Sequence, residues 1–124
     1  MHPHTLETLG PWDFDGALKS QTMTAHCRVD PDTGELFFFG YEAGGLATRD
    51  VAFCIADKDG RLVHEEWFQA PYVGLMHDFQ VTKEHVIFPV WPITADLERI
   101  KAGGAHWVWE PGQDSWIGVM PRGG

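Results

Sequence analysis

Two histidines, His26 and His77, are the residues of this sequence whose type and position could hold a metal ion. His26 lies near one end of a predicted strand, and His77 precedes another. Neutral imidazole is the commonest metal ligand in proteins. The two histidines are far apart in sequence, without the close pairing of His-Glu-x-x-His or Cys-x-x-Cys metal motifs. Their spacing alone therefore favours structural histidines bonded to carbonyl groups, with a shared metal site as the second interpretation.

Three further histidines lie on or beside predicted strands and are interpreted as structural. His64 stands next to two glutamates, but the alternation along its strand is typical of a half-solvated face. His85 lies at a turn and is expected to be exposed. His106 precedes a tryptophan in a predicted strand, where a packed or exposed structural role is expected.

The segments that would position the two candidate ligands are predicted to be short strands joined by tight turns. Thr22–Arg28 and Glu35–Glu42 flank the sequence Asp-Pro-Asp-Thr-Gly, in which proline presets a turn and glycine accepts a positive φ. Asp50–Ala56 and Arg61–Gln69 flank an Asp-Gly turn, which indicates a hairpin. These patterns predict a mainly β fold of about nine short antiparallel strands.

One short helix is expected over Thr94–Ala102. Thr94 is the predicted N-cap, Asp96 suits the first turn, and Gly103 suits the position just past the end. The whole chain, residues 1–124, is interpreted as a single β-rich segment.

Two groups of residues resemble the carotenoid cleavage oxygenase family. Thr24-Ala25-His26 with the following Val-Asp-Pro-Asp-Thr-Gly-Glu-Leu is similar to the family's Thr-Ala-His-Pro segment, and Met76–Phe79 is similar to its His-Asp-Phe segment. The lignostilbene-dioxygenase-like branch is indicated by further matches at Phe39–Tyr41, Lys101–Gly104 and Val119–Arg122. The likeness runs over nearly the whole chain.

This resemblance implies a non-haem Fe(II) site in which His26 and His77 are two of four histidine ligands. It further implies cleavage of a carbon–carbon double bond with O₂ to give two carbonyl products. The expected partner is an apolar aromatic or polyene molecule, either a stilbene or an apocarotenoid. Imidazole suits Fe(II), whose open positions admit dioxygen and substrate.

Two features depart from the family pattern. The family folds as a seven-bladed β-propeller several times longer, so this chain matches an internal fragment of about two blades, with two of the four histidines. A fragment, a truncated reading frame and a miniature completed by self-association all remain open. The second departure is Cys27, which replaces the family's usual proline after His26. A tolerated structural change is favoured over metal binding or oxidation by the thiol.

Composition excludes several classes of function. The net charge of −9 opposes nucleic-acid binding, which needs clustered Lys and Arg. No apolar run has the length of a membrane helix, and the first residues lack the features of a signal peptide. Cys27 and Cys54 are isolated and form no disulfide framework, which favours a reducing, cytoplasmic setting.

Two functions follow from these observations. The first is part of an Fe(II) dioxygenase of the carotenoid-cleavage type. The second is a catalytically incomplete β-rich fragment or interaction module derived from that family. Because half of the ligand set is absent, the isolated chain is expected to bind iron weakly and to turn over little or no substrate. Exposed strand edges also favour self-association.

Overall fold

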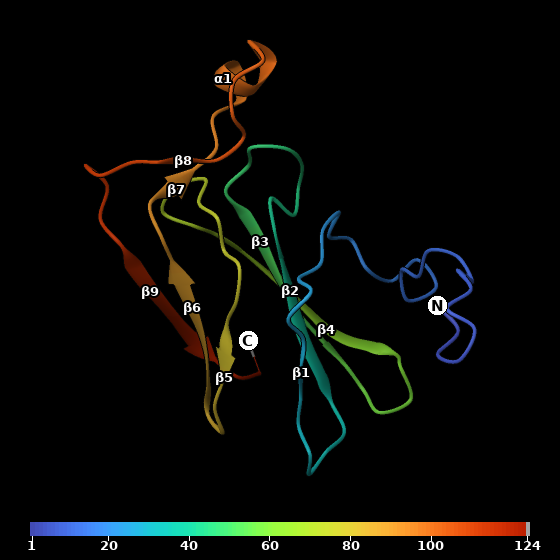
Figure 1. Cartoon of the computed structure of the whole chain (residues 1–124). Coiled ribbons are helices and arrows are strands. Elements are labelled where there is room, and N and C mark those ends of the chain that lie inside the picture. The colour runs from blue at the N-terminus through green and yellow to red at the C-terminus, as the bar shows by residue number, and fades with distance from the viewer. Residues whose placement is uncertain (124) are drawn as a thin grey trace.

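The computed structural model describes residues 1–123, in which short antiparallel strands dominate (Figure 1). Within this described part there is one helix, α1 (Leu97–Lys101). The strands are β1 (Arg28–Val29), β2 (Leu36–Tyr41), β3 (Asp50–Ala56), β4 (Leu62–Gln69), β5 (Gln80–Val81), β6 (His85–Val90), β7 (Ile93–Thr94), β8 (Val108–Trp109) and β9 (Trp116–Pro121). The mainly β prediction, with about nine short strands and one short helix, is confirmed.

The first sheet contains four antiparallel strands in the order β1-β2-β3-β4. The predicted hairpin of β3 and β4 is present, and the Asp57 carboxylate closes its turn by accepting the N–H groups of Asp59 and Arg61 at 2.9 Å. The other predicted hairpin is shorter than expected. β1 covers only Arg28–Val29. The segment before it contacts β2 through isolated hydrogen bonds, such as the one from the Thr24 N–H to the Phe39 carbonyl at 2.6 Å.

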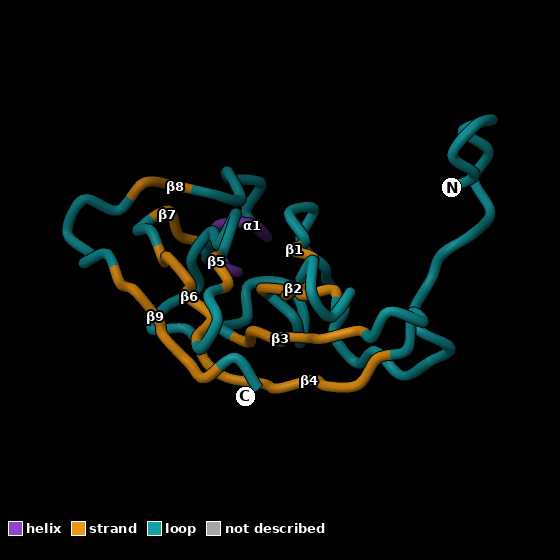
Figure 2. Tube along the Cα trace, turned by 90° about the horizontal axis from the view of Figure 1, so that it is seen from below, coloured by secondary structure: helices purple, strands orange, loops and turns teal. Residues whose placement is uncertain are grey.

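The second sheet contains β5, β6 and β9, and a small third sheet pairs β7 with β8. The last two strands, which follow each other in sequence, therefore enter different sheets. Figure 2 shows the two larger sheets side by side, with β1 and β5 at one edge and β4 and β9 at the other. The family resemblance implies about two propeller blades, and the assignment of these sheets to blades stays a prediction.

Phenylalanines join the two larger sheets. Residues 37 to 39 are consecutive phenylalanines of β2, all at most 1% exposed, because this strand is covered on both faces. Phe39 faces the second sheet and meets Phe79 and Phe88 edge-on, with ring centroids 5.1 and 5.5 Å apart. Phe38 faces the opposite way and stacks on Phe14 of the N-terminal segment at 5.4 Å. The main core therefore lies between the two sheets.

The helix starts later than predicted, so the assignment of Thr94 as its N-cap is wrong. The N-cap is Asp96, whose carboxylate accepts the Arg99 N–H at 2.7 Å. Thr94 lies instead in β7, where its extended backbone pairs with Val108. Tertiary strand pairing thus overrides the capping preference of threonine, while Gly103 has φ +81° just past the helix, as expected. No helix within residues 1–123 is long and apolar enough to cross a bilayer.

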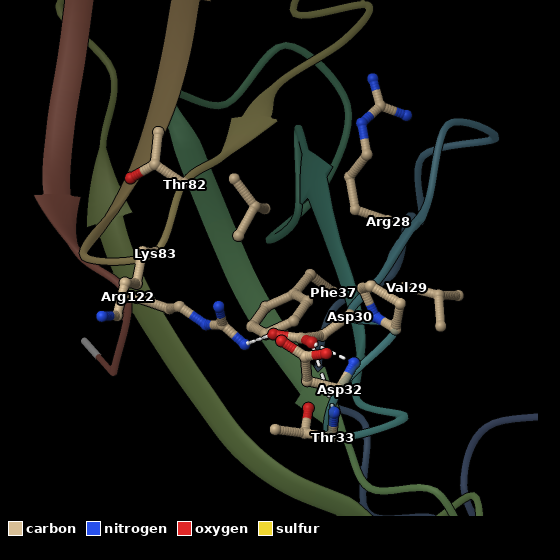
Figure 3. A pocket seen from close by; sticks show the side chains of 11 residues that line it. Arg28, Val29, Asp30, Asp32, Thr33, Phe37, Thr82, Lys83 and Arg122 are labelled. Atoms are coloured by element: carbon tan, nitrogen blue, oxygen red, sulfur yellow. Dashed lines mark hydrogen bonds and ion pairs between the residues drawn. The ribbon is translucent and has the colours of Figure 1, made fainter.

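An arginine at the end of β9 forms a second link between the larger sheets. The Arg122 guanidinium pairs with Asp30 at the turn between β1 and β2 (Figure 3). It also pairs with Glu35 at 3.4 Å. Its Cζ lies 4.6 Å from the centroid of the Phe37 ring. The hydrogen bond from Arg122 is the main cause that lowers the pKa of Asp30 below its ordinary value of 3.8.

The lowered pKa of Asp30 predicts a pH dependence of stability. Because the folded state favours the carboxylate, the ion pair stabilises the fold above the ordinary pKa, and this contribution is lost as pH falls through the lowered pKa. We expect Asp30→Asn to lower the unfolding free energy at pH 7 and to flatten the loss of stability below about pH 4. Urea unfolding at pH 7 and pH 3 measures both effects. Asp32→Asn, in the same turn, is the matched control. An unchanged acid response in D30N would contradict the role of the Asp30–Arg122 ion pair.

The outward face of the second sheet is apolar and open. Ile87 pairs with Val119, and Pro89 pairs with Ile117, on the face opposite the buried side chains of β6. Val119 is 60% exposed and Ile117 is 58% exposed. Contiguous apolar surface of this kind marks a contact surface. We call the patch formed by Ile87, Pro89, Ile117 and Val119 the open face.

The open face predicts that the isolated chain self-associates. We expect Val119→Glu to weaken association by about tenfold or more, because an unpaired carboxylate is costly to bury in an apolar contact. Sedimentation equilibrium over a concentration series measures the effect. Leu46→Glu, at an exposed loop position, is the control and should leave association unchanged. A chain that stays monomeric at high concentration would contradict the prediction.

Candidate metal centre

The structure brings His26 and His77 together. Their Nε2 atoms lie 3.0 Å apart, with ring centroids 4.7 Å apart and ring planes inclined by 58°. His26 lies just before β1 and His77 just before β5, at the edge where the two larger sheets are neighbours (Figure 1). Both side chains are exposed. The contact has the length of a hydrogen bond, with one ring donating and the other accepting according to the tautomer. Two residues far apart in the chain thus bring the same ring atom together.

The separation of the two nitrogens fits a pair of neighbouring ligands on one metal ion. Metal–imidazole bonds are about 2.1 Å long, so two such bonds at a right angle place their nitrogens about 3.0 Å apart. Binding would require both Nε2 atoms to be free of protons, with the ring protons on Nδ1. Among residues 1–123, no group of three or more His, Cys, Asp or Glu side chains could hold a metal. Within the described residues, the two imidazoles therefore have no third candidate metal ligand beside them.

Thr24 fixes the backbone of the first histidine. Its Oγ1 accepts the His26 N–H at 3.1 Å, and its own N–H donates to the Phe39 carbonyl of β2. Thr24 is only 7% exposed. A threonine two residues before a bonded N–H forms a small local turn. The His26 loop is consequently tied to the first sheet without a continuous strand.

Buried neighbours hold the segment that carries the second histidine. Met76 and Phe79 are fully buried on either side of His77. The Asp78 carboxylate accepts the Phe79 N–H at 2.8 Å and pairs with Arg28 at 2.6 Å. Asp78 thus has a structural set of partners, as the sequence predicts. The arrangement leaves the exposed His77 ring free to face His26.

The thiol of Cys27 packs against apolar side chains, which favours a structural role over metal binding. Cys27 contacts the apolar cluster around Phe38 and Cys54, and its Sγ lies 3.7 Å from the Thr24 carbonyl. Burial raises the pKa of the Cys27 thiol, partly opposed by the charge of Arg28, and burial raises the pKa of Cys54 to about 12. Because the thiolate is the metal-binding form, these environments favour a structural role. Both cysteines are free.

The other histidines have different surroundings. His106 Nε2 lies 3.3 Å from the Glu42 carboxylate. His64 packs edge-on against Phe53, with ring centroids 6.1 Å apart, and its Nε2 has no hydrogen-bond partner within the described residues. His85 is exposed, as predicted.

Sequence reasoning missed two residues that support the histidine pair, Thr24 and Arg28. The spacing of threonine two residues before His26 is a detectable sign of the local turn. Arg28 carries no comparable signal, because its partner Asp78 lies in the other sheet's segment, far away in sequence.

Known proteins share this segment. The chain is 51% identical over 124 residues to isoeugenol monooxygenase of Pseudomonas nitroreducens, covering 100% of this chain and 26% of the relative. It is 48% identical over 124 residues to carotenoid cleavage oxygenase 1 of Neurospora crassa, covering 100% of this chain and 24% of the relative. The crystal structure of Pseudomonas brassicacearum lignostilbene dioxygenase matches with a TM-score of 0.93 and 51% identity, over 97% of this chain and 25% of that one.

These matches bear out the resemblance seen in the sequence. The chain spans about a quarter of the length of the relatives it matches. The family model described as retinal pigment epithelial membrane protein matches residues 1–124, the whole of the given sequence. The chain therefore belongs to the retinal pigment epithelial membrane protein family, which includes the carotenoid oxygenases.

Proposed function

We propose that this chain is the part of a non-haem Fe(II) dioxygenase that supplies two iron ligands, His26 and His77. The whole protein would cleave a carbon–carbon double bond of a stilbene or an apocarotenoid with O₂, giving two carbonyl products. The observation that carries the proposal is the 3.0 Å separation of the two Nε2 atoms. The names of the relatives, an isoeugenol monooxygenase, a carotenoid cleavage oxygenase and a lignostilbene dioxygenase, support this class of substrate.

The residues of this chain would hold the metal ion and orient its two histidine ligands. None of them would need to act as a general base. Bound Fe(II) would supply open coordination positions for dioxygen and the redox chemistry of the cleavage. His26 and His77 would each give the Nε2 lone pair of a neutral imidazole. Thr24 would keep the His26 loop against β2, and the buried Met76 and Phe79 would keep His77 facing it.

The proposal includes the setting of the protein. Residues 1–124 would act as a single β-rich segment of the propeller. The partner would be an apolar aromatic or polyene molecule together with O₂. A reducing, cytoplasmic setting is supported by the two free cysteines.

A second candidate is a catalytically incomplete fragment or interaction module. Two observations favour it for the chain taken by itself. Within residues 1–123 no third metal-binding side chain joins the histidine pair, and the open face presents apolar surface for contact with another β-sheet. The two candidates agree on the histidine pair. They differ in whether the pair serves a larger catalytic protein or a module that carries out no turnover.

The metal site is tested by titrating the isolated chain with Co²⁺ under anaerobic conditions and measuring affinity by calorimetry. We expect weak, one-to-one binding, because two imidazoles leave most coordination positions to water. His26→Ala and His77→Ala should each lower affinity by more than the roughly tenfold cost typical of losing an outer-shell partner. Turnover of a lignostilbene in air, measured after loading with Fe(II), should be little or none.

His85→Ala is the matched control, since His85 is an exposed histidine of the second sheet. Affinity that survives both H26A and H77A would contradict the assignment of the ligands. Tight, stoichiometric iron in the purified monomer would contradict the view that the chain holds only part of the site.

A further inference from the structure

The guanidinium of Arg28 lies between the two loops that carry the histidines. On one side Nη1 donates to the carbonyl oxygens of His26 and Cys27, at 3.4 and 3.3 Å. On the other side Nη2 donates to the Asp78 carboxylate at 2.6 Å and to the Phe79 carbonyl at 3.2 Å. The Arg28 Cζ lies 5.6 Å from the centroid of the Phe79 ring. One side chain thus contacts the residue after each histidine and the His26 carbonyl itself.

The chemistry of arginine suits this position. Its planar group presents five donors in a rigid fork, so it can bind two backbones at once and fix the distance between them. Lysine carries the same charge on one compact ammonium group at the end of a flexible chain. It cannot donate to all four acceptors that the Arg28 guanidinium contacts. The Asp78 carboxylate also accepts the Phe79 N–H, which holds it in place to receive Nη2. The link is therefore directional as well as electrostatic.

We propose that Arg28 is a positioning residue that holds the rings of His26 and His77 at ligand spacing before any metal arrives. This inference rests on the proposed function of the two histidines. Preorganisation of this kind lowers the cost of ordering the ligands on binding. Losing an outer-shell partner typically weakens metal affinity by about 10–100-fold.

The chain offers a matched comparison in Arg122. Arg122 also joins the two larger sheets through carboxylates and lies over a phenylalanine ring. Its partner Asp30 follows β1, whereas Arg28 begins β1 and extends away from Arg122 (Figure 3). Substitution of either arginine removes an inter-sheet link, but only Arg28 contacts the histidine loops.

The experiment compares Arg28→Lys, Arg28→Gln and Arg122→Lys in the complete 124-residue chain, at a concentration where sedimentation shows the monomer. The first readout, without metal, is the nuclear Overhauser contact between the imidazole protons of His26 and His77. The second is Co²⁺ affinity by calorimetry. We expect R28K and R28Q to lose the ring contact and about tenfold or more in affinity. R122K should keep both, although its unfolding free energy falls.

Each outcome decides the inference. Retention of the ring contact and affinity in R28K, equal losses in R122K, or absence of the ring contact in the unsubstituted chain would overturn it. If the Arg28 variants do not fold, Asp78→Asn gives the same test, because it removes the charge and leaves an acceptor for the Phe79 N–H. Failure of the unsubstituted chain to bind Co²⁺ would refute the proposed function, while the ring contact would still decide the role of Arg28.

Discussion

Packing of the two larger sheets through their phenylalanines is the constraint on which the histidine pair depends. Phe39 and Phe79 meet edge-on with ring centroids 5.1 Å apart. The Phe39 carbonyl accepts the N–H of Thr24, two residues before His26, and Phe79 lies two residues after His77. The contact that joins the sheets therefore lies next to both histidine loops, and a shift at this contact would move the rings relative to each other.

Apolar and polar contacts make different contributions to this arrangement. Burial of phenylalanine rings is strongly favourable, at roughly 25 cal/mol per Å² of apolar surface, but it has little directional preference. It can hold two sheets together without fixing a ring orientation. Hydrogen bonds from Thr24 and Arg28 add the direction, because each has a preferred geometry at its acceptor. The aromatic core thus brings the two histidine loops close together. The hydrogen bonds of Thr24 and Arg28 then set the spacing of the two imidazole rings.

The sequence predicts the parts of this structure that depend on local patterns. The β3–β4 hairpin follows from the Asp-Gly turn, in which Gly60 has a positive φ of 80°. The capping of this turn by the Asp57 carboxylate is a further feature of the structure. Strand β2 follows from its continuous run of apolar residues, which is typical of a strand buried on both faces. The sequence predicts the start of the helix too early, because strand pairing of Thr94 with β8 overrides its capping preference. Pro89 lies inside β6, where proline usually marks a strand end, at a place where β5 does not extend alongside.

The candidate site was only partly predictable for a related reason. Spacing alone favoured structural roles for His26 and His77, and their pairing was indicated by the family resemblance. The sequence does not indicate a role for Arg28, because its partner Asp78 is brought close only by the tertiary fold. Contacts between distant segments leave no periodic pattern in the sequence, whereas turns and strand faces do.

If His26 and His77 are ligands of one metal ion, both bind it through their Nε2 atoms. Anomalous scattering from crystals of the chain grown with Co²⁺ tests this most directly. We expect a single peak within bonding distance of both nitrogens, with the ring planes inclined by about the 58° seen in the structure. A peak bound to one ring only, or rings turned away from each other, would contradict it.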